Sequence, residues 1–171
     1  ELRASYKLGK TTNVDWEDIC TGPGPEAGKH YIYIGDIGDN NASHKSCKIY
    51  RLEEPEFMPA HEGNLVQYDV QPDVIELVYP DGARDAECLM IDPLTKDLLL
   101  VSKMEDPVRL YVARYPQKIG TPDTLLFVGT FSFPFVTAGD ISADGSKIIL
   151  KSYTDIIGWE RKGNESLHQC L

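Results

Sequence analysis

Short apolar runs, separated by turns rich in Gly, Pro, Asn and Asp, follow one another along the whole chain. Val, Ile, Leu and Tyr dominate these runs, which is typical of β-strands. No segment keeps a helical periodicity over the roughly ten residues that would predict a helix. The pattern therefore predicts an all-β fold. The clearest predicted strands are 30–34, 48–52, 74–79, 98–102, 109–113, 125–129 and 147–151.

The runs also repeat as a unit of about four strands, which is typical of β-propeller blades. In each unit an acidic strand is followed by a turn, a strongly apolar strand and a strand that carries an aromatic residue and an Arg. The acidic strands are 16–19, 85–89 and 139–142. The fourth strand is 125–131 in the second unit, and either 65–68 or 74–79 in the first.

The repeats predict one partial β-propeller over residues 1–171, with about three four-stranded blades at 13–82, 83–135 and 136–171, the last of them incomplete. A propeller needs about four to eight blades to close, and an open arc exposes strand edges. We therefore expect half of a six-bladed ring, completed by a second polypeptide segment. The alternative is a standalone β-sandwich of about ten or eleven strands, which a chain of this length could build.

The charge balance is strongly acidic, with 27 Asp and Glu against 17 Lys and Arg and a net charge of −10. This balance argues against nucleic acid and against anionic membrane surfaces as partners. No apolar run reaches the roughly 18 residues that span a bilayer. The chain has no initiating Met and no signal-peptide pattern, so we expect a processed chain. The excess of carboxylates favours a hard cation such as Ca²⁺ as a ligand.

The cysteines and sequons favour a secreted, extracellular protein. The cysteines lack the spacing of a zinc site. As disulfide candidates they allow three pairings, between which the sequence does not choose; the alternative is four buried free thiols. The residues concerned are Cys20, Cys47, Cys88 and Cys170, with possible N-glycans on Asn41 and Asn164.

Acidic residues at the start of the innermost strands of a propeller converge on its central channel. Glu17, Glu87 and Asp140 occupy matching places in the three repeats, with Asp18 and Asp85 beside them. Carboxylates gathered in this way repel one another unless a cation or a shared proton relieves them, and Ca²⁺ accepts oxygens from separate elements. The alternative is that these acids cap strand ends and bind backbone N–H groups.

A second candidate for a cation site is the segment 35–41, in which acids and amides surround a glycine. Its candidate ligands are Asp36, Asp39 and Asn40, since a glycan on Asn41 would turn that residue to solvent. The segment lacks the spacing and terminal Glu of an EF-hand. The alternative is a Gly- and Asn-rich hairpin turn. Arg84 either faces an anionic substrate or pairs with neighbouring carboxylates.

Four phrases, 13–19, 32–40, 79–87 and 140–145, resemble a poorly characterised family of secreted β-propeller proteins from bacteria and invertebrate animals. More distantly, the chain is similar to six-bladed calcium propellers, which include phytase-like proteins, paraoxonase and the senescence-marker lactonases. The resemblance implies further blades, and calcium held by channel carboxylates. Glu17 and Glu87 match such ligands best, and Asp140 matches them less well.

Two functions follow from these observations. The first is a calcium-binding extracellular module that binds a protein or a glycan on its loops. The alternative is a calcium-dependent hydrolase of phosphate or carboxylic esters, in which the metal acts as Lewis acid and Asp18 or Asp85 acts as base. The sequence favours the module, because it contains no complete catalytic motif of the calcium propellers.

Overall fold

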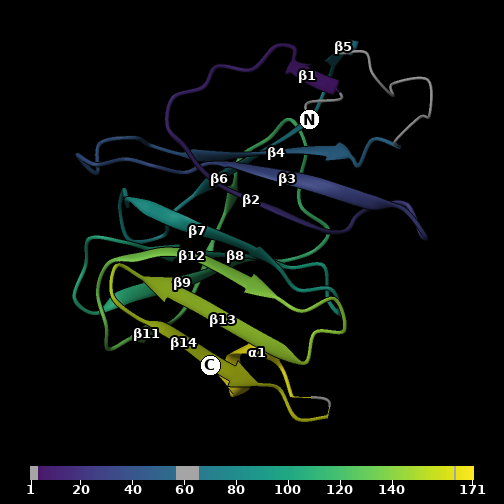
Figure 1. Ribbon diagram of the computed structural model, residues 1–171. Coiled ribbons are helices and arrows are strands. Elements are labelled where there is room, and N and C mark those ends of the chain that lie inside the picture. The colour runs from purple at the N-terminus through teal and green to yellow at the C-terminus, as the bar shows by residue number, and fades with distance from the viewer. Residues whose placement is uncertain (1–3, 57–65, 164) are drawn as a thin grey trace.

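The computed structural model describes residues 4–56, 66–163 and 165–171. Within these ranges the chain forms fourteen β-strands and one short helix, α1 (Leu167–Cys170). The strands make four sheets that lie one above another, with the two chain ends at opposite ends of the stack (Figure 1). The all-β prediction is therefore confirmed, and the sheets are blade-like rather than the two facing layers of a β-sandwich. No helix in the described part of the chain is long and apolar enough to cross a membrane.

Three antiparallel sheets follow one another in chain order. The first sheet consists of β2 (Trp16–Pro23), β3 (His30–Asp36), β4 (Cys47–Glu53) and β6 (Asp73–Val78), with β10 (Asp123–Thr124) added in parallel to β6. The second sheet consists of β7 (Ala86–Ile91), β8 (Leu98–Ser102), β9 (Val108–Ala113) and β11 (Leu126–Phe131). The third sheet consists of β12 (Val136–Ile141), β13 (Lys147–Ser152) and β14 (Ile156–Glu160).

The fourth strand of the first sheet is β6, so the segment 74–79 takes the place that the sequence left open. The competing segment contains β5 (Val66–Val70), which instead pairs in parallel with β1 (Ala4–Leu8); Leu65 lies outside the described residues. Tyr6 stacks on Tyr68 across this pair, with ring centroids 5.2 Å apart. The β1–β5 pair forms a separate small sheet above the first sheet (Figure 1).

Strand β8 is buried along its whole length because both of its faces are covered. Leu98 and Leu100 belong to the core between the first and second sheets. Leu99 and Val101 belong to the core between the second and third sheets. This double burial explains the unbroken apolar run at 98–102, since a strand covered on both sides needs no polar face. The inner strands β2, β7 and β12 pack side by side at the common edge of the three sheets.

All four cysteines are free thiols, so the disulfide prediction is wrong for this structure. Cys20 and Cys47 lie in the core between the first two sheets, Cys88 lies in the next core, and Cys170 packs against it. Burial raises the pKa of the Cys47 thiol to about 12. Three of these thiols therefore fill the cores as small apolar side chains, which is the alternative that the sequence left open.

A buried ion pair joins the third sheet to the second. Asp92 follows β7 and Arg161 follows β14, and both side chains are 2% exposed. The guanidinium donates two hydrogen bonds to the carboxylate, from Nη1 to Oδ1 over 3.1 Å and from Nη2 to Oδ2 over 2.9 Å. A paired geometry of this kind fixes orientation as well as charge, so the pair sets how the last strand lies on the second sheet.

Replacing Arg161 with Met should lower the free energy of unfolding by about 3–5 kcal/mol, because Asp92 would stay buried without its counter-charge. Urea denaturation measures this loss. The control is Lys118→Met, since Lys118 pairs with Asp123 and the two side chains are 58% and 33% exposed. An exposed pair contributes about 1 kcal/mol or less. Equal losses in the two variants would contradict the role of the buried pair.

Candidate functional site

Each inner strand carries one bulged residue near its start. The pairing register skips Glu17 in β2, Glu87 in β7 and Thr137 in β12. Bulges redirect side chains and are frequent next to binding sites. Glu17 and Glu87 therefore occupy matching positions, as predicted. Asp140 does not occupy the matching position, because it lies three residues beyond the bulge of β12. The prediction aligned it with Glu17 and Glu87 by its acidic character, but the strand pairing places Thr137 there instead.

The carboxylates of Asp15 and Glu17 converge on Gly38. A Cβ atom on Gly38 would lie 2.5 Å from the Asp15 carboxylate and 2.8 Å from Glu17 Oε1, so a larger residue there would displace these two carboxylates. The Gly38 N–H donates to the Asp15 carbonyl over 3.1 Å. Sequence analysis missed Asp15, although it lies only two residues before Glu17, because it precedes the predicted acidic strand 16–19.

Glu87 brings a third carboxylate to this place, and Lys103 brings the neutralising cation. Lys103 is 9% exposed and forms an ion pair with Glu87. Its ammonium group also lies 5.6 Å from the centre of the Tyr153 ring. We refer to Asp15, Glu17 and Glu87 as the carboxylate cluster. Lys103 follows the second strand of its unit, and no pattern in the sequence distinguished it from a surface lysine.

The pKa of Glu17 is raised to about 7. Burial is the largest cause, and the charges of Glu87 and Asp15 add to it, while Lys103 acts in the opposite direction. Close carboxylates cannot all ionise freely. The cluster therefore holds more negative charge than Lys103 neutralises, and at neutral pH it relieves part of this charge by keeping a proton on Glu17.

Asp18 and Asp140 form a separate pair further along the inner strands. Asp18 Oδ2 accepts a hydrogen bond of 2.8 Å from the Leu89 N–H, which joins β2 to β7. Burial raises the pKa of Asp18, and the charge of Asp140 adds to the shift. Asp140 accepts from its own neighbour, Ile141 N–H, over 2.8 Å. Both carboxylates thus bind backbone N–H groups, which was the alternative to metal binding for them.

The acidic side chains of the segment 35–41 accept hydrogen bonds that hold the segment and its neighbours in place. Asp36 accepts from the backbone of Val14 and Asp15 and from the Tyr50 hydroxyl. Asp39 accepts from the N–H groups of Ser43 and His44, each over 2.7 Å. These bonds use the carboxylates to fold the turn, as the alternative of a hairpin turn anticipated. Exposed Asn40 contacts the Asp15 carboxylate at 3.5 Å.

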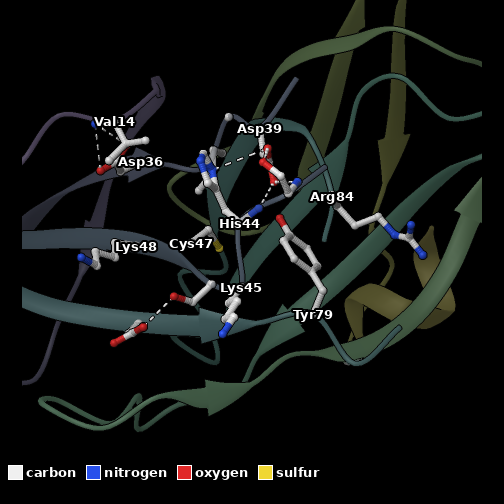
Figure 2. A pocket seen from close by; sticks show the side chains of 14 residues that line it. Val14, Asp36, Asp39, His44, Lys45, Cys47, Lys48, Tyr79 and Arg84 are labelled. Carbon is white, nitrogen blue, oxygen red and sulfur yellow. Dashed lines mark hydrogen bonds and ion pairs between the residues drawn. The ribbon is translucent and has the colours of Figure 1, made fainter. Parts of the chain in front are cut away.

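Asp85 lies behind this turn and accepts the Asp39 N–H over 2.8 Å. Beside it is a cavity of about 370 Å³, lined by the β3–β4 turn and by Tyr79. Figure 2 shows the Tyr79 hydroxyl pointing toward His44 and Asp39, while Arg84 points away. Arg84 pairs instead with Asp81 and Glu105 at 3.3 and 3.0 Å, which confirms the ion-pair interpretation.

The eight predicted metal ligands therefore divide among separate places. Within the described ranges, no group of three or more His, Cys, Asp or Glu side chains is arranged to hold a metal ion. The predicted ligands lie in the carboxylate cluster (Glu17, Glu87), at the contact between inner strands (Asp18, Asp140) and around the β3–β4 turn (Asp36, Asp39, Asn40, Asp85). The carboxylate cluster is the candidate site, because three carboxylates act on one another there with one lysine as counter-charge.

Comparison with known proteins gives little beyond the fold. No protein-family model matches the chain, and no curated protein matches it. A solved structure of the Dos1 propeller is similar to it, with a TM-score of 0.42 and 14% sequence identity over 83% of this chain. The chain spans about a third of that structure, 31% of its length.

The raised pKa of Glu17 predicts a pH dependence of stability. The folded protein holds this proton more tightly than the unfolded chain, since the pKa is about 7 rather than 4.5. The stabilisation is therefore complete below about pH 4.5 and is lost as the pH rises through 7. Urea denaturation at pH 5 and pH 8 should show a smaller difference in Glu17→Gln than in the wild type. The control is Glu160→Gln, which should keep the wild-type difference in stability between the two pH values. If Glu17→Gln also keeps that difference, the raised pKa of Glu17 is contradicted.

Proposed function

We propose that this chain is a non-catalytic binding module whose carboxylate cluster takes up a cation, with Ca²⁺ the best match to its oxygen donors. The observation that carries the proposal is that Asp15 and Glu87 both raise the pKa of Glu17, near the bulges of adjacent inner strands, while Lys103 is paired with Glu87. A bound cation would take the place of the proton on Glu17, because either one reduces the repulsion between the three carboxylates.

The donor set fits a hard cation on the side of the cluster away from Lys103. Asp15 and Glu17 would hold the ion, and the exposed amide of Asn40 lies next to Asp15. Glu87 is already paired with Lys103 and would add charge rather than a free donor. Since no ready-made metal group exists among the described residues, we expect an affinity like that of extracellular calcium modules, with Kd about 10⁻⁴–10⁻³ M.

A hydrolase would require a free base beside the ion. Asp18 accepts from the Leu89 and Ile19 N–H groups and is engaged in the fold. Asp85 accepts from Asp39 N–H through Oδ1, whereas its Oδ2 has no hydrogen-bond partner among the described residues; the residue is only 8% exposed and does not belong to the carboxylate cluster. We therefore favour binding over catalysis.

Titration of the purified chain with Ca²⁺, measured by isothermal titration calorimetry, tests the cation site. Glu17→Gln and Asp15→Asn should each weaken binding at least tenfold, since each removes one of the two negative charges that would hold the ion. Binding should also weaken below pH 7, because Glu17 must lose its proton first. The control is Asp144→Asn, whose carboxylate is bonded within its own turn. Absence of calcium binding, or binding that Glu17→Gln leaves unchanged, would refute the site.

We further propose that the protein is secreted and carries an N-glycan on Asn41, which is exposed in the β3–β4 turn; Asn164 lies outside the described residues. Expression through a eukaryotic secretory pathway should give a glycosidase-sensitive mass that Asn41→Gln removes. Ser43→Ala should remove the glycan and also loosen the turn, since the Ser43 hydroxyl contacts Asp39. A product without glycan from the wild-type sequence would contradict the proposal.

A further inference from the structure

The cavity of about 370 Å³ beside the β3–β4 turn has none of the residues of the carboxylate cluster in its wall. Its volume lies within the range of small-molecule sites, about 300–1,000 Å³. Tyr79 forms the buried end of the cavity and is 7% exposed. The Tyr79 ring packs edge-on against Tyr111, with ring centroids 4.8 Å apart. Figure 2 shows the Tyr79 hydroxyl pointing toward His44 and Asp39 of the turn, so it is aimed into the cavity.

The Tyr79 hydroxyl has no hydrogen-bond partner among the described residues. The Cys47 thiol lies near it, but a thiol is only a weak partner. Burial is the main cause that raises the pKa of Tyr79 well above its usual value, so the hydroxyl keeps its proton and is a donor. A buried donor without a partner is costly. A ligand group that accepts this hydrogen bond would remove the cost.

Asp85 supplies an unpaired acceptor near the Tyr79 hydroxyl. Its Oδ1 accepts the Asp39 N–H, whereas its Oδ2 has no partner in the described part of the chain. The charge of Asp85 contributes to the raised pKa of Tyr79, so the two groups lie within electrostatic reach of each other. A ligand hydroxyl suits this pair, because it can accept from Tyr79 and donate to Asp85. A carboxylate could not donate, and an ammonium group could not accept.

The open side of the cavity offers both donors and acceptors. Ser43 and Ser46 each donate a hydroxyl proton to a neighbouring carboxylate, which leaves their oxygens as acceptors. Exposed Lys45 adds an ammonium donor. Asp36 and Asp39, in the same wall, already accept hydrogen bonds from the backbone. This mixture suits a ligand with several hydroxyls rather than one with a single strong charge.

We propose that this cavity binds a small neutral polyol, with a monosaccharide as the best match. One ligand hydroxyl would lie between Tyr79 and Asp85, and others would contact the polar side chains of the open side. A cation is disfavoured, since Asp36 and Asp39 are already bonded to the backbone. An anion is disfavoured, since the unpaired oxygen of Asp85 would repel it. The cavity is a second site, independent of the carboxylate cluster.

Titration of the ¹⁵N-labelled full-length chain with glucose, galactose or mannose, followed by amide NMR shifts, tests the proposal. A chelator in the buffer keeps the outcome independent of the cation site. At least one of the three sugars should shift the amides of Ser43, His44 and Lys45 saturably. Tyr79→Phe should weaken this binding about five- to tenfold. It should not lower the midpoint of urea denaturation, because the hydroxyl that it removes has no partner among the described residues.

Tyr33→Phe is the matched control. Tyr33 is also buried, but its hydroxyl donates to the Pro23 carbonyl over 2.7 Å, away from the cavity. This variant should lower the urea midpoint and leave sugar binding unchanged. The proposal is overturned if none of the three sugars gives a saturable shift, which would mean that water alone fills the cavity. It is equally overturned if Tyr79→Phe binds as the wild type does, or if glucuronate binds more tightly than all three neutral sugars.

Discussion

The burial of the second sheet on both faces is the constraint on which the rest of the structure depends. The first and third sheets do not touch a common core; each packs on one side of β8, whose leucines and valine are divided between two cores. Hydrophobic burial of this kind is the main stabilising contribution in a domain. The inner strands meet as a consequence, and only this meeting brings Glu17 and Glu87 from different sheets into one electrostatic site.

The carboxylate cluster in turn depends on the hydrogen bonds of a neighbouring carboxylate. Asp36 holds the backbone of Val14 and Asp15, which positions the Asp15 side chain beside Gly38. Lys103 neutralises part of the charge by pairing with Glu87. An acidic site that kept no counter-charge would destabilise the compact chain, whereas complete neutralisation would remove the attraction for a cation. The arrangement of one lysine and three carboxylates lies between these limits.

Much of the fold could be predicted from the sequence, because strand periodicity and repeats are local signals. The apolar run at 98–102 predicted a buried strand, and the aligned acids predicted that Glu17 and Glu87 would match. The choice of β6 over β5 as the fourth strand could not be predicted, since both segments have strand character and only long-range pairing decides between them. Asp140 was misaligned because a bulge shifts the register without changing the apolar pattern. Asp15, Gly38 and Lys103 became visible only once the strands were placed together.

The bulges also allow the acidic residues to change without a change in the sheets that carry them. A bulge adds one residue to the inner strand and none to its partner, so a single residue can be gained or lost there while the pairing on both sides is kept. The third sheet has Thr137 at this position and still forms its ladder. Acidic character at the bulges can therefore evolve one sheet at a time, by substitution or by insertion of a single codon, without repacking either core.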